Sequence, residues 1–95
     1  MKPRPVLLLR QMPPFYDYLV CALSSKLHHE CPGFDEVITF SDDEFPDSGS
    51  KVASLIRLGM RTTLSHSAIL GKLGTVSEAR LNRMRIRLAR CIQAE

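Results

Sequence analysis

The residue best placed for chemistry is Arg4, a single guanidinium between two prolines at the start of an apolar run. Pro3 and Pro5 flank Arg4, and Val6–Leu9 follows without a polar interruption. Proline cannot donate to a sheet ladder and is tolerated at the first residue or the edge of a strand. It also restricts the backbone of its neighbours. Because arginine is permanently charged and its planar group suits phosphate, we predict that Arg4 lies at the rim of a small sheet, as an RNA-handling site would require.

Other chemistries fit the sequence less well. The run 28–31 (His-His-Glu-Cys) has adjacent histidines rather than the i, i+3 or i, i+4 spacing of metal ligands, so we predict no metal site. The run 65–67 pairs serine with histidine in sequence only, without the elbow motif of a serine hydrolase. Gly71-Lys72 precedes a leucine where a phosphate-binding loop needs serine or threonine, so no nucleotide cofactor is expected.

Three aromatic residues surround the Pro13-Pro14 turn and could stack on bases. They are Phe15, Tyr16 and Tyr18. Tyr18 starts an apolar run and is more typical of strand packing, whereas Tyr16 is a candidate base-binding residue.

Short strands at close spacing are predicted to position these residues. The strands are 6–10, 18–23 and 36–40, pieces at 54–58 and 61–64, and a last short strand at 68–73. Gly59 lies between two of these pieces and predicts a bulge or bend. Residues 11–16 form a turn and 41–50 a polar, solvated loop. The pattern predicts a single domain, 1–95, that is mainly β and built as a small curved sheet or barrel.

A helix is predicted at the C-terminus. Ser77 is a good N-cap, and Glu78 favours the positive end of the helix dipole. One face carries an apolar stripe that should pack on the core: Leu81, Met84, Leu88, Cys91 and Ile92. Beside it runs an arginine stripe expected at the rim, with Arg85 further round: Arg80, Arg83, Arg87 and Arg90. This stripe is either a solvated face or a surface for nucleic acid or an acidic partner.

Composition and charge narrow the function classes. With 44% apolar residues the chain can bury a modest core, and it contains no membrane-length apolar run and no secretory signal. The three cysteines (21, 31 and 91) form no CxxC pair and are odd in number, which favours a reduced, cytoplasmic location. The net charge of +3 is unevenly divided: residues 31–50 carry six carboxylates and no base, whereas residues 51–95 carry nine bases. A basic half can attract polyanions.

The order of these segments resembles the MazF/PemK family of toxin–antitoxin ribonucleases. Five stretches carry the resemblance along nearly the whole chain: 4–9 (RPVLLL), 19–27 (LVCALSSKL), 33–38 (GFDEVI), 54–59 (SLIRLG) and 69–77 (ILGKLGTVS). The resemblance implies an SH3-like barrel with a C-terminal helix, usually a homodimer. It also implies a toxin that cuts single-stranded RNA without a metal, by attack of the neighbouring 2′-hydroxyl on the phosphate, and that is held by a cognate antitoxin.

Two catalytic positions carry over from the family. The arginine of its Arg-Pro strand matches Arg4, and the hydroxyl residue at the end of the following strand best matches Ser24, with Ser25 as the substitute if the register slips by one. Ser25, Lys26 and Tyr16 are the candidate substrate-binding residues. A guanidinium and a hydroxyl can both stabilise charge on phosphorane oxygens, but the pKa of arginine, above about 12, makes it a poor proton-transfer group.

One departure from the family pattern bears on activity. Family members carry a further strand, beginning with a Gly-Asp pair, before the Arg-Pro strand, whereas here Met1 lies three residues ahead of Arg4. The expectation from the sequence is therefore an N-terminally truncated member with an exposed sheet edge. Three explanations stay open: a start codon assigned too late, a degraded copy, or a partner that supplies the edge. Two functions stay open: an active endoribonuclease toxin, or a non-catalytic module that keeps the dimer or antitoxin surface.

Overall fold

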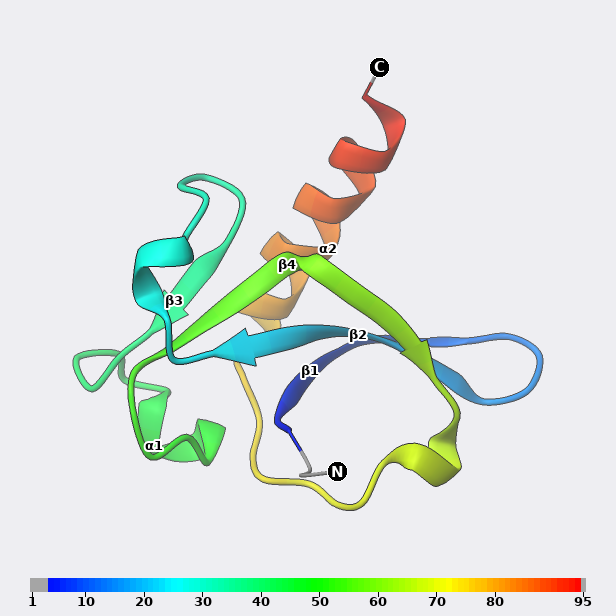
Figure 1. The fold of residues 1–95 in the computed structure, drawn as a ribbon, viewed down its shortest axis with the longest axis horizontal. Coiled ribbons are helices and arrows are strands. Elements are labelled where there is room, and N and C mark those ends of the chain that lie inside the picture. Colours follow the sequence, from blue (N-terminus) through cyan, green and yellow to red (C-terminus); the bar gives the residue numbers. More distant parts are fainter. Residues whose placement is uncertain (1–3, 95) are drawn as a thin grey trace.

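A computed structural model describes residues 4–94 of the chain, so Pro3 lies outside the described residues. The strands are β1 (Val6–Met12), β2 (Asp17–Ser24), β3 (Glu36–Ile38) and β4 (Ser54–Leu64). The helices are α1 (Phe45–Ser48) and α2 (Glu78–Gln93), with short 3-10 turns η1 (Leu27–His29) and η2 (His66–Ala68). The strands form one curled antiparallel sheet in the order β1-β2-β4-β3 (Figure 1). The prediction of a mainly β chain with a C-terminal helix is confirmed.

The β1–β2 hairpin contains a bulge at Leu9. Leu8 pairs with Val20, but Arg10 pairs with the very next residue of β2, Leu19, so Leu9 is an extra residue in β1. Its side chain is buried in the core. A bulge of this kind leaves its own backbone groups outside the ladder and re-aims the neighbouring side chain, and both effects recur below.

The two predicted strand pieces around Gly59 are one continuous strand, β4, with a bend. Cys21 of β2 pairs with Arg61, whereas the next residue, Ala22, pairs with Arg57, so three residues of β4 are left out of the ladder at this point. The freed N–H of Leu58 donates to the buried Asp35 carboxylate at 2.9 Å. The prediction of a bulge at Gly59 is confirmed, and the bend in β4 is visible in Figure 1.

The main core lies between the sheet and α2. Its fully or nearly buried members come from three strands and the helix: Leu9, Cys21, Ile56, Leu58, Met84 and Leu88. Because side chains alternate along a strand, the neighbours of Cys21 and Ile56 point to the opposite face. Val20 and Leu55 lie there and are buried as well. The centre of the sheet is therefore apolar on both sides. Burial raises the pKa of the Cys21 thiol to about 12, which keeps it protonated.

The apolar stripe of α2 is shorter than predicted. Met84 and Leu88 are buried and Leu81 packs against them, but Cys91 and Ile92 are exposed, so the prediction that these two pack on the core is wrong. The physical reason is the position of the helix, whose C-terminal turns extend past the strands (Figure 1). Within residues 4–94, neither α-helix combines the length and the apolarity that a membrane crossing requires.

The predicted strand at 68–73 is absent, and the predicted loop at 41–50 contains helix α1. After η2 the chain runs to α2 without joining the sheet, and Leu70 and Leu73 are exposed. The segment instead crosses closely over α1: Thr75 N–H donates to Asp47 O at 2.7 Å, and a Cβ at Gly74 would collide with the backbone of Ser48. The backbone at residues 74 and 75 therefore contacts α1, and no strand among the described residues lies beside the segment to form a ladder with it.

The packing of α2 gives a paired test. We expect Leu88→Ala to lower the free energy of unfolding by about 2–5 kcal/mol, because the side chain is buried against the sheet. Ile92→Ala on the same helix should change it by less than about 0.5 kcal/mol, since Ile92 is 69% exposed. Urea unfolding of both variants measures the difference, and equal losses would contradict this position of the helix.

Candidate functional site

The arginine stripe of α2 is largely used inside the molecule. Arg80, predicted at the rim, is 6% exposed and holds three carboxylates. Its Nη1 lies 2.9 Å from Glu36 Oε1, its Nη2 lies 3.5 Å from Asp42 Oδ1, and its Nε donates to Glu44 Oε1. The prediction for Arg80 is wrong because the acidic segment that follows β3 folds over the start of α2 and neutralises the guanidinium.

Neighbouring groups complete this ionic cluster. Glu44 also accepts from Ser77 N at 3.0 Å, while Ser77 Oγ accepts from Arg80 N at 3.1 Å as the predicted N-cap. Arg83 Nε and Arg87 Nη1 bind Glu36 Oε2 at 2.9 and 2.8 Å. The loop predicted to be solvated is therefore partly an internal counter-charge. Arg80 is buried, and Arg83 and Arg87 are paired with Glu36 while remaining partly exposed.

The cluster lowers the pKa of its carboxylates. The Arg83 hydrogen bond, aided by the charges of Arg80 and Arg87, holds the pKa of Glu36 below its ordinary 4.5 despite partial burial. Burial opposes the shift at Glu44, but hydrogen bonds from Ser77 and Arg80 lower the pKa of that group as well. A carboxyl with a lowered pKa in the folded state stabilises the fold above its unfolded pKa, and this stabilisation is lost as the pH falls through the folded value.

A substitution at Arg80 tests the cluster. We expect Arg80→Met to lower the free energy of unfolding at pH 7 by about 3–5 kcal/mol, because three carboxylates lose their buried partner. Arg90→Met, an exposed residue of the same helix, should stay within about 0.5 kcal/mol of the parent. Thermal melts between pH 7 and pH 3 should show the parent losing stability below about pH 4.5 and Arg80→Met losing less. Parallel curves for the two would contradict the cluster.

Arg4 and Ser24 both lie at the open end of the β1–β2 hairpin, where Arg4 precedes β1 and Ser24 is the last residue of β2. Val6 pairs with Ala22, and Leu23 N–H donates to Pro5 O at 3.4 Å. Arg4 precedes β1 and is not part of the ladder, but continuing this register two residues beyond Val6 would set Arg4 opposite Ser24. Directly opposite residues of antiparallel strands point to the same face, and for this pair it is the face away from α2, since Leu23 contacts the core under the helix.

The candidate residues after Ser24 continue from the end of β2. Ser24 Oγ accepts from Lys26 N at 3.0 Å, which closes the turn and leaves the hydroxyl proton available to donate to a ligand. Ser25 is exposed, and Lys26 leads directly into η1. All three residues therefore lie at the same end of the sheet as Arg4.

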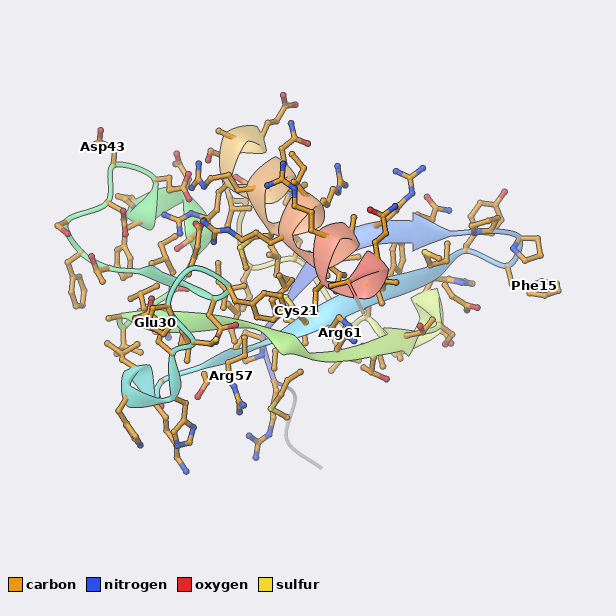
Figure 2. The ribbon with its side chains drawn as sticks, turned by 90° about the horizontal axis from the view of Figure 1, so that it is seen from above. Phe15, Cys21, Glu30, Asp43, Arg57 and Arg61 are labelled. Atoms are coloured by element: carbon orange, nitrogen blue, oxygen red, sulfur yellow. The ribbon has the colours of Figure 1, made fainter. Side chains whose placement is uncertain are left out.

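A second guanidinium, Arg57, shares this face and was missed by the sequence reasoning. Arg57 pairs with Ala22, which places it one step diagonally from Ser24 across the β2–β4 ladder. Figure 2 shows Arg57 on the side of the sheet opposite α2. Its Nη1 contacts the Met60 sulfur, and no carboxylate among residues 4–94 pairs with it. A lone arginine in an apolar run was the only sequence signal, because pairing with β2 depends on long-range register.

The η1 turn adds an imidazole next to these cations. η1 contacts β4, and the rings of His28 and His29 meet edge to face at 4.3 Å between centroids. Local desolvation and then the charges of His28, Arg57 and Lys26 lower the pKa of His29 below its ordinary 6.5. The nearby positive charges therefore favour the uncharged form of this exposed imidazole. We call the set Arg4, Ser24, Lys26, His29 and Arg57 the strand-end site.

Tyr16 does not belong to the strand-end site. It lies in the β1–β2 turn, beyond the Met12–Asp17 pair, at the opposite end of the hairpin from Ser24. Over the residues that the structure describes, no three histidine, cysteine or acidic side chains are grouped as a metal site would need. The chemistry available to the strand-end site is therefore that of cations, a hydroxyl and an imidazole around an anion.

Comparison with known proteins adds no assignment. The sequence matches no protein-family model and no curated protein sequence. The likeness to the MazF/PemK family thus rests on the segments quoted above, and it stays a prediction.

Proposed function

We propose that the chain is a metal-independent endoribonuclease of the MazF/PemK type, with an SH3-like barrel, and that the strand-end site holds the scissile phosphate. The observation that carries the proposal is the pairing of Arg57 with Ala22, two residues before Ser24 on β2, at the end of the sheet where the Leu23–Pro5 hydrogen bond continues the β1–β2 register toward Arg4. Two guanidiniums and a hydroxyl can surround one phosphate from three strands. Charge-assisted hydrogen bonds of this kind are the strong ones for phosphate.

The proposed reaction assigns each group one task. The 2′-hydroxyl of the RNA attacks the adjacent phosphorus, and the bond to the 5′-oxygen breaks, leaving a 2′,3′-cyclic phosphate and a 5′-hydroxyl. Arg4 and Arg57 neutralise the charge that grows on the non-bridging oxygens, and Ser24 donates to the same oxygens. The uncharged form of His29 accepts the 2′-hydroxyl proton, the task that an arginine cannot perform. A water molecule or the protonated His29 then donates a proton to the leaving 5′-oxygen.

The same proposal names the partners. The substrate is single-stranded RNA, whose unpaired bases a protein can reach, and the activity is that of a cytoplasmic toxin restrained by a cognate antitoxin. In this proposal two copies of the chain form a homodimer.

A non-catalytic interaction module is the second candidate, and one observation favours it. β1 is an outer strand of the described sheet, and its Leu8 is 40% exposed. An unpaired edge with apolar side chains can add a strand from a partner chain. The two candidates differ in a single readout, which is cleavage of RNA.

Arg4 is the first residue to test. We expect the protein to cleave a single-stranded oligoribonucleotide in the presence of EDTA and to yield cyclic-phosphate ends, detected by mass spectrometry. Arg4→Ala should lower kcat/KM about 10²–10³-fold, as loss of one anion-stabilising donor does elsewhere, with little change in the free energy of unfolding because Arg4 is exposed. Arg90→Ala serves as the matched control. Full activity in Arg4→Ala, or cleavage only with added metal, would refute the mechanism, and no cleavage at all would favour the interaction module.

The role of His29 is tested by the pH profile. Because the neutral imidazole is the active form and its pKa is lowered, the parent rate should rise with pH along an acid limb whose midpoint lies below pH 6.5. We expect His29→Gln to lower the rate about 10²–10⁴-fold and to remove this acid limb. His66→Gln, in the exposed η2 turn, should keep the parent profile. An unchanged acid limb in His29→Gln would exclude His29 as the base.

A further inference from the structure

A second cationic feature lies at the other end of the hairpin, on the side of the sheet that faces α2. It is an open hollow of about 590 Å³ between the β1–β2 turn and the helix. We call it the turn pocket, and its walls are Arg10, Gln11 and Met12 of β1, the Pro13-Pro14 pair and Tyr16 of the turn, and Arg85 of α2.

The Leu9 bulge fixes one of its guanidiniums. Leu9 is the extra residue of β1, so its carbonyl is outside the ladder, and Arg85 Nε donates to it at 2.6 Å. This contact uses one of the five N–H donors of Arg85 and anchors the group through its Nε. The two terminal nitrogens remain for a ligand. A guanidinium held by the backbone in this way has already lost part of the freedom that ligand binding would cost.

The same bulge supplies the second guanidinium. Because Leu9 is inserted, Arg10 pairs with Leu19, whose side chain contacts the core under α2, so Arg10 lies on the helix side of the sheet together with Arg85. No carboxylate lines the pocket. The nearest one in the register, Asp17 opposite Met12, forms no ion pair with either arginine within the described part of the chain.

This lack of counter-charge separates the turn pocket from the rest of the helix. Arg80, Arg83 and Arg87 of α2 all have carboxylate partners. Arg85 has a carbonyl and an arginine beside it instead. Two guanidiniums that face one hollow repel each other unless an anion lies between them. The pocket is therefore suited to an anionic ligand.

Tyr16 adds an aromatic surface at the edge of the pocket. Its side chain is 64% exposed, and its backbone has φ of 61°, an uncommon conformation for a residue other than glycine. An exposed ring beside two cations can stack on a base while the two cations neutralise the phosphate next to that base. The amide of Gln11 supplies further hydrogen-bonding groups.

We infer that the turn pocket binds a backbone phosphate and the adjacent base of single-stranded RNA, as a second contact remote from the strand-end site. This inference rests on the proposed function for the identity of the ligand. Arg4 precedes β1 by two residues and Arg10 lies within it, and six residues of extended backbone span about 20 Å at about 3.3 Å per residue. A mononucleotide cannot reach both places, whereas an oligonucleotide that passes round the outer strand β1 can. The pocket thus sets a minimum length for tight binding.

The experiment measures binding without cleavage. A fluorescein-labelled 2′-O-methyl dodecaribonucleotide lacks the attacking hydroxyl, so its Kd can be followed by anisotropy across a range of salt concentrations. We expect Arg10→Gln/Arg85→Gln to weaken binding about tenfold and to reduce the salt slope by about 0.7–1.4. Tyr16→Ala should weaken binding at least about fivefold. Arg61→Gln/Arg90→Gln removes the same charge elsewhere and should change Kd less than twofold. Arg10→Gln alone leaves the hydrogen bond from Arg85 to the Leu9 carbonyl intact, so weaker binding by this variant cannot result from the loss of that bond.

Each outcome decides the question. Equal Kd values for the pocket double variant and the matched double variant would overturn the inference, as would competition by uridine monophosphate at the oligonucleotide's own concentration. If Arg4→Ala loses cleavage but still binds RNA in a way that depends on Arg10 and Arg85, both the proposed reaction and the inference about the turn pocket are supported. Binding that depends on the pocket in a protein that never cleaves RNA would overturn the proposed reaction and keep the pocket. If the Kd does not depend on Arg10 and Arg85 while cleavage is unimpaired, the inference about the turn pocket is overturned and the proposed reaction is kept.

Discussion

The buried guanidinium of Arg80 is the interaction on which the rest of the structure depends. It ties the first turn of α2 to Glu36 of β3 and to the acidic segment before α1, joining residues 36 to 44 positions apart in the sequence. A charge this buried is tolerated only when it is fully paired, so the acidic segment must fold over the helix. The helix position then places Met84 and Leu88 on the sheet and Arg85 beside the Leu9 bulge.

Two irregularities in the sheet decide where its cations point. The bulge at Leu9 turns Arg10 toward α2 and frees the carbonyl that holds Arg85. The bend at 58–60 in β4 pairs Arg57 with Ala22, next to Ser24, and leaves Arg61 on the helix side with Cys21. Labels in Figure 2 show Arg57 and Arg61 on opposite sides of the sheet. Without these irregularities the strict two-residue alternation of a strand would distribute the charges differently.

Ion pairs with carboxylates neutralise three arginines of α2, whereas the arginines near the two ends of the β1–β2 hairpin form no ion pair within the described residues. Glu36 of β3 pairs with Arg80, Arg83 and Arg87, and Asp42 and Glu44 of the following segment pair with Arg80 as well. The basic half of the chain therefore does not form one continuous basic surface. Of the cations without a carboxylate partner in the described residues, Arg10 and Arg85 line the hollow at the turn end of the β1–β2 hairpin, and Arg57 lies near its open end.

The sequence by itself determined the features that depend on near neighbours. The strand periods, the Ser77 cap, the Gly59 bend and the placement of Arg4 at a strand entrance follow from contacts within a few residues, and Met84 and Leu88 follow from helical spacing. Only the tertiary structure decided which arginines have carboxylate partners, because the guanidiniums of Arg80 and Arg57 are chemically identical and the segments that lie beside them come from distant parts of the sequence. It also decided that 68–73 is no strand and that Ile92 is exposed. A strand needs a partner edge and a buried residue needs a surface to cover it, and neither is encoded in the segment itself.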